Sequence, residues 1–213
     1  MAAACAAALS PAFLIGSRPL PAEEPVEEEP ECIISEYDNI FRRIGAEQGV
    51  DWRLLSAMAY TESRFAADAV SPSGAVGLMQ IMPYVARDFG ASPEDLLDPE
   101  VNIDMAVRIM RSVEKMLRLP AGMAQHDRTA LVLACYNGGY AHISDARSLA
   151  CYYGDDPSSW ESVAEYLELL GDEDFNNHEA VNFGGFGGFG ETVAYVDKVL
   201  ARYARYCRIA PEN

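Results

Sequence analysis

Apolar residues recur every three or four positions along most of the chain from residue 33 onward, which is the spacing of one face of an α-helix. The clearest case follows Asp51, a residue type that caps helix N-termini, where Trp52, Leu55 and Ala59 fall on one face. The same spacing recurs over residues 102–119, 129–136, 143–152, 160–170 and 192–207. No segment combines apolar–polar alternation with hairpin turns. The pattern predicts an all-α globular domain of about seven to nine helices.

The breaks between these segments are typical helix punctuation, among them Ser71-Pro72-Ser73-Gly74, Asp98-Pro99 and Asn137-Gly138-Gly139. One low-complexity patch, Phe183–Gly190, reads FGGFGGFG. Each interior glycine costs a helix about 1 kcal/mol relative to alanine, so we do not expect a stable helix there. The three rings either cover a groove from a mobile loop or anchor the loop on the core, and the sequence leaves both alternatives open.

The N-terminal residues 1–31 depart from the helical pattern. Met1–Gly16 is Ala-rich and apolar, like part of a secretion signal or an anchor, but is shorter than the ~20 apolar residues of a membrane-spanning helix. Residues 18–31 are rich in Pro and Glu, as in an extended tether or a disordered acidic tail. We therefore expect two parts: residues 1–31, a signal or anchor remnant with a tether, and residues 32–213, a folded domain.

Charge and metal-ligand patterns exclude several classes of function. The 213 residues include 33 acidic and 16 basic ones, a net charge of −17 that repels nucleic acid and anionic membrane surfaces. Five cysteines show no zinc spacing, and the four after Cys5 leave three disulfide pairings open. Asp172-x-Asp174-x-Asn176 begins like a calcium loop but lacks the later Gly and Glu. We predict no metal and no cofactor.

The candidate chemistry begins with Glu62, which continues the apolar face of Trp52, Leu55 and Ala59. A carboxyl on such a face must be paired, reached by solvent from a cleft, or protonated with a raised pKa. A raised pKa is what a general acid working near neutral pH needs. The residues after Glu62 lead into a segment with Gly74 and other small residues, where a bulky ligand can approach the backbone closely. These features indicate a candidate active site.

Four motifs in order carry a resemblance to a known family. They are Glu62-Ser63, Gly77-Leu78-Met79-Gln80 with Ile81-Met82-Pro83, Tyr136-Asn137 within an Ala-Cys-Tyr-Asn-Gly run, and Glu191-Thr192 with Tyr195-Val196. Over residues 36–208 the chain resembles the soluble-type catalytic domain of lytic transglycosylases, which is akin to goose-type lysozyme. His142-x-x-Asp145-Ala146-Arg147 further resembles the branch called membrane-bound lytic transglycosylase F. The resemblance implies a lysozyme-like all-α domain.

The activity implied by the resemblance is cleavage of the MurNAc-β-1,4-GlcNAc bond of peptidoglycan without water. In that reaction the muramoyl 6-hydroxyl closes onto C1 and leaves a 1,6-anhydro end, so a single carboxylate serves as acid and then as base. By resemblance that carboxylate is Glu62. The implied substrate-binding residues are Ser71, Gln80, Met82, Tyr136, Asn137, Glu191 and Tyr195. Two departures from the family are Cys135, where Ala is usual, and the glycine-rich patch before Glu191.

Two other functions remain open at this stage. A hydrolytic lysozyme or chitinase on the same scaffold needs a second carboxylate, for which Asp68 and Asp104 are candidates. A glycan-binding envelope protein without catalysis needs no acid at position 62. For the enzyme we expect peptidoglycan strands as partner, a monomer, and a place in the periplasm or cell envelope. A membrane tether through the N-terminus would anchor it at the outer membrane.

Overall fold

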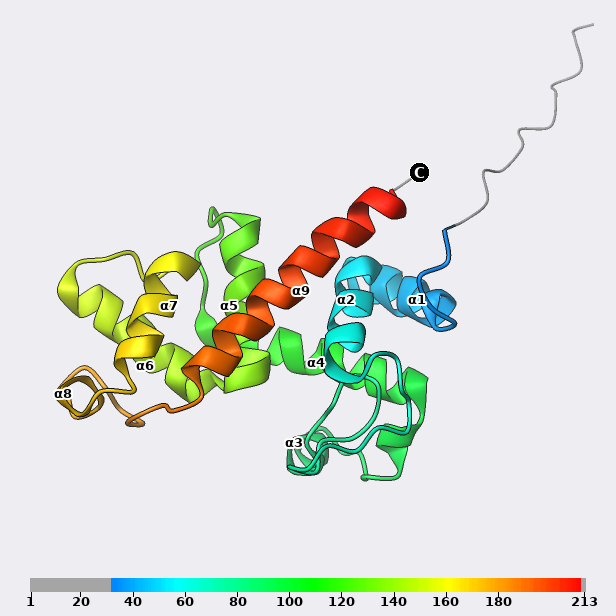
Figure 1. Ribbon diagram of the computed structural model, residues 1–213, viewed down its shortest axis with the longest axis horizontal. Helices are drawn as coiled ribbons and strands as arrows, with labels where there is room; N and C mark the ends of the chain where they lie inside the picture. The colour runs from blue at the N-terminus through cyan, green and yellow to red at the C-terminus, as the bar shows by residue number, and fades with distance from the viewer. Residues whose placement is uncertain (1–31, 212–213) are drawn as a thin grey trace, which may run out of the picture. The chain divides into compact units, whose positions relative to one another are not determined.

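Residues 32–211 are described by a computed structural model, and they are helical, as the spacing of their apolar residues predicts. Figure 1 shows how these helices follow one another. Within this range the chain forms α1 (Asp38–Gln48), α2 (Trp52–Ser63), α3 (Pro83–Asp88), the 3₁₀ helix η1 (Asp95–Leu97), α4 (Pro99–Leu117), α5 (Gln125–Gly138), α6 (Tyr140–Tyr153), α7 (Trp160–Leu169), α8 (Glu173–Asn176) and α9 (Phe189–Ile209). The expected all-α class is confirmed for this part of the chain.

Local side chains fix where several helices begin. The Asp51 carboxylate accepts a hydrogen bond from the backbone N–H of Arg53, so Asp51 is the N-cap of α2, as expected. Asp98 caps α4 in the same way, directly before Pro99 at the first helical position. Ser159 accepts a hydrogen bond at the start of α7. Each start is thus set by residues adjacent to it in the sequence.

The glycine-rich patch Phe183–Gly190 differs in part from its expectation. Residues 183–188 form a loop, but Phe189 and Gly190 are the first two residues of α9. Glycine is tolerated at a helix start, where few intrahelical hydrogen bonds depend on it. The helix therefore begins inside the patch rather than after it.

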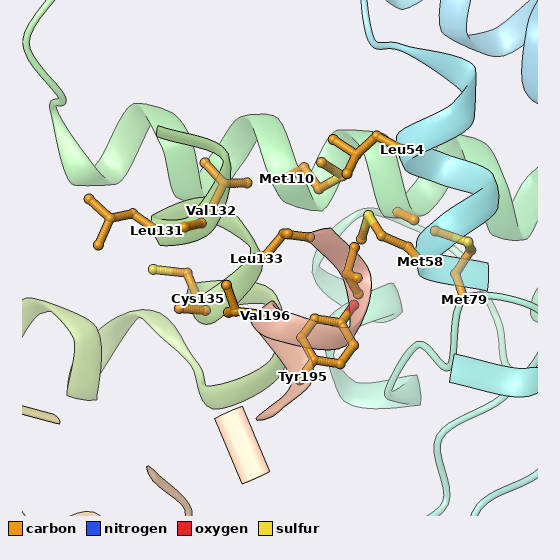
Figure 2. Close-up of a cluster of buried hydrophobic side chains, with 14 of the residues drawn as sticks. Leu54, Met58, Met79, Met110, Leu131, Val132, Leu133, Cys135, Tyr195 and Val196 are labelled. Carbon is orange, nitrogen blue, oxygen red and sulfur yellow. The ribbon is translucent and has the colours of Figure 1, made fainter. Parts of the chain in front are cut away.

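The core is built around α9, which packs along both α2 and α5 (Figure 1). Figure 2 shows the cluster where α2, α4, α5 and α9 meet, with labelled residues Leu54, Met58, Met79, Met110, Leu131, Val132, Leu133, Cys135, Tyr195 and Val196. Fully burying one Leu or Met side chain contributes about 1.5–3 kcal/mol relative to leaving it in water. This packing holds the C-terminal ends of α2 and α5 against the N-terminal half of α9.

Between α2 and α3 the chain forms neither helix nor regular strand. Two isolated antiparallel bridges join Val76 to Val70 and to Ile81. Residues 75–79 are buried although they lie in this irregular segment. Buried backbone N–H and C=O groups need hydrogen-bond partners, so such a segment has to be held by side chains from elsewhere in the fold.

The predictions for the N-terminal tail fall on residues 1–31, outside the described range. Within residues 32–211, no helix combines the length and the apolar character that crossing a membrane requires. The four cysteines of this range, Cys32, Cys135, Cys151 and Cys207, are free thiols. Burial raises the pKa of the Cys135 thiol to about 12, as expected for a thiol inside an apolar helix face.

Candidate active site

Glu62 lies in the last turn of α2, on the face that Leu55 and Ala59 place in the core. Those two residues are fully buried, whereas Glu62 keeps part of its surface open to solvent. The surrounding protein excludes most of the water that an ionised carboxylate needs, and burial raises the pKa of Glu62 to about 7. Near neutral pH this carboxyl can both give and accept a proton, as general acid–base catalysis requires.

Two tyrosines flank Glu62. Tyr195 of α9 is buried, and its hydroxyl lies close enough to lower the pKa of Glu62, against the larger effect of burial. The same hydroxyl has no hydrogen-bond partner other than Glu62 within the described range. Burial, and then the charge of Glu62, raise the pKa of Tyr195 and of Tyr136 well above the usual value. Both phenols are therefore protonated next to the carboxyl.

A second carboxylate, that of Glu191, acts on Glu62 from the first turn of α9. Its charge raises the pKa of Glu62, an effect smaller than that of burial. Glu191 itself is exposed, at a helix N-terminus where a negative charge is favourable. Asp68 and Asp104 have no such effect on Glu62: Asp68 is exposed, and Asp104 accepts a hydrogen bond from Gln48. Among the described residues, Glu191 is thus the one carboxylate coupled to Glu62.

The backbone turns sharply directly after Glu62-Ser63. Arg64 and Phe65 have φ angles of 55° and 67°, in the left-handed region that bulky residues rarely adopt. Each costs of order 1 kcal/mol, which the surrounding structure has to offset. The turn ends α2 at once and leaves Glu62 at the helix terminus rather than within a longer helix.

Two hydrogen bonds tie the following segment to the helices around Glu62. The Ser63 hydroxyl donates to the carbonyl oxygen of Leu78 at 2.8 Å. The Tyr136 hydroxyl donates to the carbonyl oxygen of Met79 at 2.7 Å. Since Ser63 lies in α2 and Tyr136 in α5, both helices are fixed to the same short stretch of backbone. This stretch is the Gly-Leu-Met-Gln motif singled out in the sequence.

The same stretch is also bound by Asn102, a fully buried residue of α4. Its side-chain oxygen accepts a hydrogen bond from the backbone N–H of Met79 at 2.7 Å. Its amide nitrogen donates to the carbonyl oxygens of Val76 at 3.1 Å and Leu96 at 2.9 Å. One amide therefore binds two backbone groups of the irregular segment and one of η1.

The remaining predicted residues of this segment lie along it. Gln80 has a φ of 49°, and its amide nitrogen donates to the carbonyl oxygens of Ala69 and Gly77. The Ser71 hydroxyl accepts a hydrogen bond from the backbone N–H of Ala75 at 2.9 Å. Met82 is half-buried at the start of α3. Gln80 and Ser71 thus shape the segment, and their contacts with a glycan stay predictions.

On the other side of Glu62, Asn137 joins α5 to α9. Its side-chain oxygen accepts a hydrogen bond from the hydroxyl of buried Thr192 at 2.8 Å. A Cβ atom on Gly138 would come within 2.6 Å of the Thr192 hydroxyl, so a larger residue would push the two helices apart. Thr192 lies between Glu191 and Tyr195 in α9, and this contact therefore sets the spacing between both residues and Tyr136-Asn137.

The loop before α9 is anchored by one ring and one carboxylate. Phe186 stacks on His142 of α6 with ring centroids 4.2 Å apart, and its backbone N–H donates to Leu170. The buried Asp145 carboxylate accepts hydrogen bonds from the backbone N–H groups of Asn182 and Phe183. Phe183 itself is 59% exposed. The anchoring alternative thus applies to Phe186, while the Phe183 ring faces solvent.

No group of three His, Cys, Asp or Glu side chains within residues 32–211 is placed to hold a metal ion. Asp172, which opens the calcium-like pattern, instead caps α8 by accepting a hydrogen bond from the backbone N–H of Asp174. The pattern therefore has a structural explanation in this fold.

A family model described as the Transglycosylase SLT domain matches residues 39–155, more than half of the chain. The chain belongs to the SLT transglycosylase domain family. Two curated relatives are named "Membrane-bound lytic murein transglycosylase F": one from Marinobacter nauticus, 37% identical over 173 residues, and one from Alcanivorax borkumensis, 35% identical over 167 residues. These alignments cover 81% and 78% of this chain but 33% and 34% of the relatives. The chain thus spans about a third of their length.

Solved structures share the fold of this SLT domain. The 70 kDa soluble lytic transglycosylase SLT70 from Escherichia coli matches with a TM-score of 0.56 and 24% identity, over 83% of this chain and 25% of that one. A complex of the 70 kDa soluble lytic transglycosylase with bulgecin A gives a TM-score of 0.57 and 25% identity, over 84% of this chain and 25% of that one. The lysozyme-like all-α fold expected from the motifs is confirmed.

Three residues that hold the SLT site together were given no role by sequence reasoning: Asn102, Asp145 and Thr192. Each had a detectable signal. Two of them are polar residues on apolar helix faces: Asn102 shares its face with buried Met105 and Ala106, and Asp145 shares its face with buried Leu149. Thr192 belongs to the Glu-Thr motif, in which the sequence assigns a role to Glu191 alone. A buried polar residue with no evident chemistry is a sign that it satisfies backbone groups elsewhere.

Proposed function

We propose that this SLT domain cleaves the MurNAc-β-1,4-GlcNAc bond of peptidoglycan as a lytic transglycosylase, with Glu62 as the single acid and base. The observation that carries the proposal is a carboxyl with a pKa of about 7 at the end of α2, between the protonated phenols of Tyr136 and Tyr195. The names of the curated relatives support the same activity.

The reaction needs one proton donor that becomes a proton acceptor. Protonated Glu62 gives its proton to the glycosidic oxygen as the bond between that oxygen and C1 of MurNAc breaks, which releases GlcNAc with a free hydroxyl. The MurNAc 6-hydroxyl then bonds to C1 and its proton passes to the Glu62 carboxylate. Atoms balance without water, the product carries a 1,6-anhydro ring, and Glu62 is protonated again. A pKa near the working pH suits both steps.

The internal hydroxyl explains why one carboxylate suffices. Hydrolytic glycosidases use two, one of them as a nucleophile or to activate water. Here the acceptor is already attached to the sugar, so its effective concentration at C1 is high. The Tyr195 hydroxyl, which has no other partner in the described structure, donates to Glu62 when that group is charged. This donor would stabilise the carboxylate between the two proton transfers.

We assign the neighbouring residues to glycan binding. The set is Ser71, Gln80, Met82, Tyr136, Asn137, Glu191 and Tyr195, which lie on the segment after α2, the end of α5 and the start of α9. Gln80 and Asn137 each use one part of their amide to hold the site, which leaves the other part of the amide for hydroxyl or acetamido groups of the sugar. The half-buried Met82 offers apolar surface for a sugar face.

The location and assembly of the protein are parts of the same proposal. A peptidoglycan substrate places the domain in the periplasm or cell envelope, and relatives named membrane-bound agree with that placement. We propose that residues 32–213 are the catalytic domain and act as a monomer. Residues 1–31 would then be a signal or anchor remnant and a tether toward the outer membrane.

The decisive experiment is a digest of purified peptidoglycan by the full chain, with the fragments analysed by mass. Lytic cleavage gives fragments one water lighter than hydrolysis products, which borohydride does not reduce. In oxygen-labelled water these fragments acquire no label. A labelled, reducible product would instead show that the protein is a hydrolase, with Glu191 as the second carboxylate. Binding of peptidoglycan without any cleavage would favour the non-catalytic glycan-binding protein.

A further inference from the structure

A hollow of this domain lies away from Glu62. It is a cavity of about 760 Å³, within the range of small-molecule sites, between the start of α2, the second half of α4 and the start of α5. Leu54 of α2 lines it and precedes Glu62 by eight residues, which is about 12 Å along a helix. On α9 the lining residue is Tyr203, eight residues after Tyr195. The cavity thus lies toward the other ends of the helices that carry the active site.

Four cations line this cavity in a protein of net charge −17. Arg111, Lys115 and Arg118 follow one another at i, i+4 and i+7 of α4 and its C-cap, so they share one face over about 10 Å. In the described part of the chain none of these three has an ion pair or side-chain hydrogen bond. These cations are exposed, so their mutual repulsion is weak, and an anion bound among them offsets what remains of it.

The two acidic residues in the lining are already neutralised. Glu114 forms an ion pair with Arg128 at 2.8 Å. Asp51 is bound by Arg53 at 2.6 Å and accepts a hydrogen bond from the Tyr203 hydroxyl at 2.7 Å. The cations of α4 are therefore not balanced from within the cavity. Stabilisation of a helix C-terminus explains Lys115 and Arg118 in part, but not Arg111, two turns earlier.

An independent feature favours an anion at the same place. The N-terminus of α5 opens at the cavity, where Gln125 and Thr129 line the wall. Its N-cap is Ala124, which has no side chain to accept a hydrogen bond from the first backbone N–H groups. A long helix with uncapped N–H groups carries a partial positive charge there and binds oxyanions readily. The floor between this terminus and α4 is apolar, with Leu54, Met110 and Val132.

We infer that this cavity binds a small organic anion with two oxyanion groups, carboxylate or phosphate, separated by an apolar part. One oxyanion group lies at the α5 terminus, and the other lies along Arg111, Lys115 and Arg118. The apolar part covers Leu54 and Met110. This site is distinct from the proposed glycan-binding residues around Glu62 and does not depend on catalysis there.

The test is a titration of the full chain at low ionic strength with pimelate and with pentane-1,5-diyl bisphosphate, followed by calorimetry and by amide NMR shifts. Each probe carries two oxyanion groups on an apolar chain. We expect saturable binding of at least one probe, with shifts at the amides of Gln125 and Thr129. Preference for pimelate identifies a carboxylate ligand and preference for the bisphosphate a phosphate ligand. Because charged hydrogen bonds are lost, R111E combined with R118E weakens binding about ten- to a hundredfold.

The matched control is R205E, which reverses an exposed cation of α9 outside the cavity and leaves the affinity unchanged. Thermal melts of both variants check that the fold is retained, since all three positions are exposed. The inference is overturned if neither probe saturates, if the shifts lie elsewhere, or if R205E weakens binding as much as the double variant. None of these outcomes depends on peptidoglycan cleavage, so the two proposals can fail separately.

Discussion

Gly77 and Asn102 fit together because residue 77 has no side chain. A Cβ atom at this position would collide with the amide nitrogen of Asn102 and with the carbonyl oxygen of Leu96. Gly77 also has a φ of 83°, a conformation that residues with a side chain rarely adopt. The close approach lets one buried amide bind two backbone groups of the segment between α2 and α3 and one backbone group of η1. Both the packing against Asn102 and the backbone conformation therefore require glycine at position 77.

We therefore expect Asn102→Ala to destabilise the domain strongly. The change leaves the N–H of Met79 and the carbonyl oxygen of Leu96 without partners, whereas Val76 still accepts a hydrogen bond from Ile81. The cost is about 1–3 kcal/mol for each group that water cannot reach. Urea denaturation measures the loss. Asn182→Ala, which alters an exposed amide, serves as the control and changes stability by about 0.5 kcal/mol or less. Equal effects of the two variants would contradict the structural role of Asn102.

Glu62→Gln is expected to reduce peptidoglycan turnover by about 10²–10⁴-fold or more, because Gln keeps the shape but has no proton to deliver. Glycan binding should stay nearly unchanged, which a pull-down with insoluble peptidoglycan measures. Glu168→Gln, on the exposed side of α7, is the matched control and should retain full turnover. Undiminished turnover of Glu62→Gln would remove this residue from the mechanism.

The pH dependence of turnover follows from the raised pKa of Glu62. The acid must be protonated to act, so kcat/KM should fall as the pH rises through about 7. Glu191→Gln removes a negative charge that raises this pKa, so the alkaline limb should move to lower pH. Added salt should move the wild-type limb in the same direction, since Glu191 is exposed and its charge is screened. A shift to higher pH in Glu191→Gln would contradict the coupling.

Stability should depend on pH for the same reason. The pKa of Glu62 is about 7 in the fold against 4.5 for a free Glu, so the folded state holds this proton more tightly. As the pH rises from about 4.5 to about 7, the unfolded chain loses the proton first and the free energy of unfolding falls. Glu62→Gln removes this fall and should gain at most about 3 kcal/mol over the wild type above pH 7. Below about pH 4 the gain should vanish.

The two aromatic residues of the loop before α9 should respond differently to truncation. Phe186→Ala removes the stack on His142 and the contact beside Gly138, and should cost about 2–4 kcal/mol. Phe183→Ala removes an exposed ring and should change stability by about 0.5 kcal/mol or less. Thermal unfolding of both variants tests this. A larger loss of stability for Phe183→Ala than for Phe186→Ala would show that Phe183, and not Phe186, anchors the loop.

The helices of this protein could be predicted from its sequence because their signals are local. Apolar spacing, the capping carboxylates Asp51 and Asp98, and the breaks at glycine and proline all act within a few residues. Glu62 was found for the same reason: a carboxyl on an apolar helix face is visible as a pattern. The motif resemblance added the neighbouring site residues, whose glycan contacts stay predictions.

Only the tertiary structure shows what holds those motifs in place. Asn102 meets Met79 across 23 positions, Thr192 meets Asn137 across 55, and Tyr136 meets Met79 across 57. The pKa of Glu62 likewise depends on burial by distant segments and on Tyr195 and Glu191 of the last helix. These are contacts between residues far apart in the chain, and their energies arise from desolvation and hydrogen bonding inside the packed fold. A sequence pattern reports which side chains are buried, whereas packing alone decides which buried groups meet.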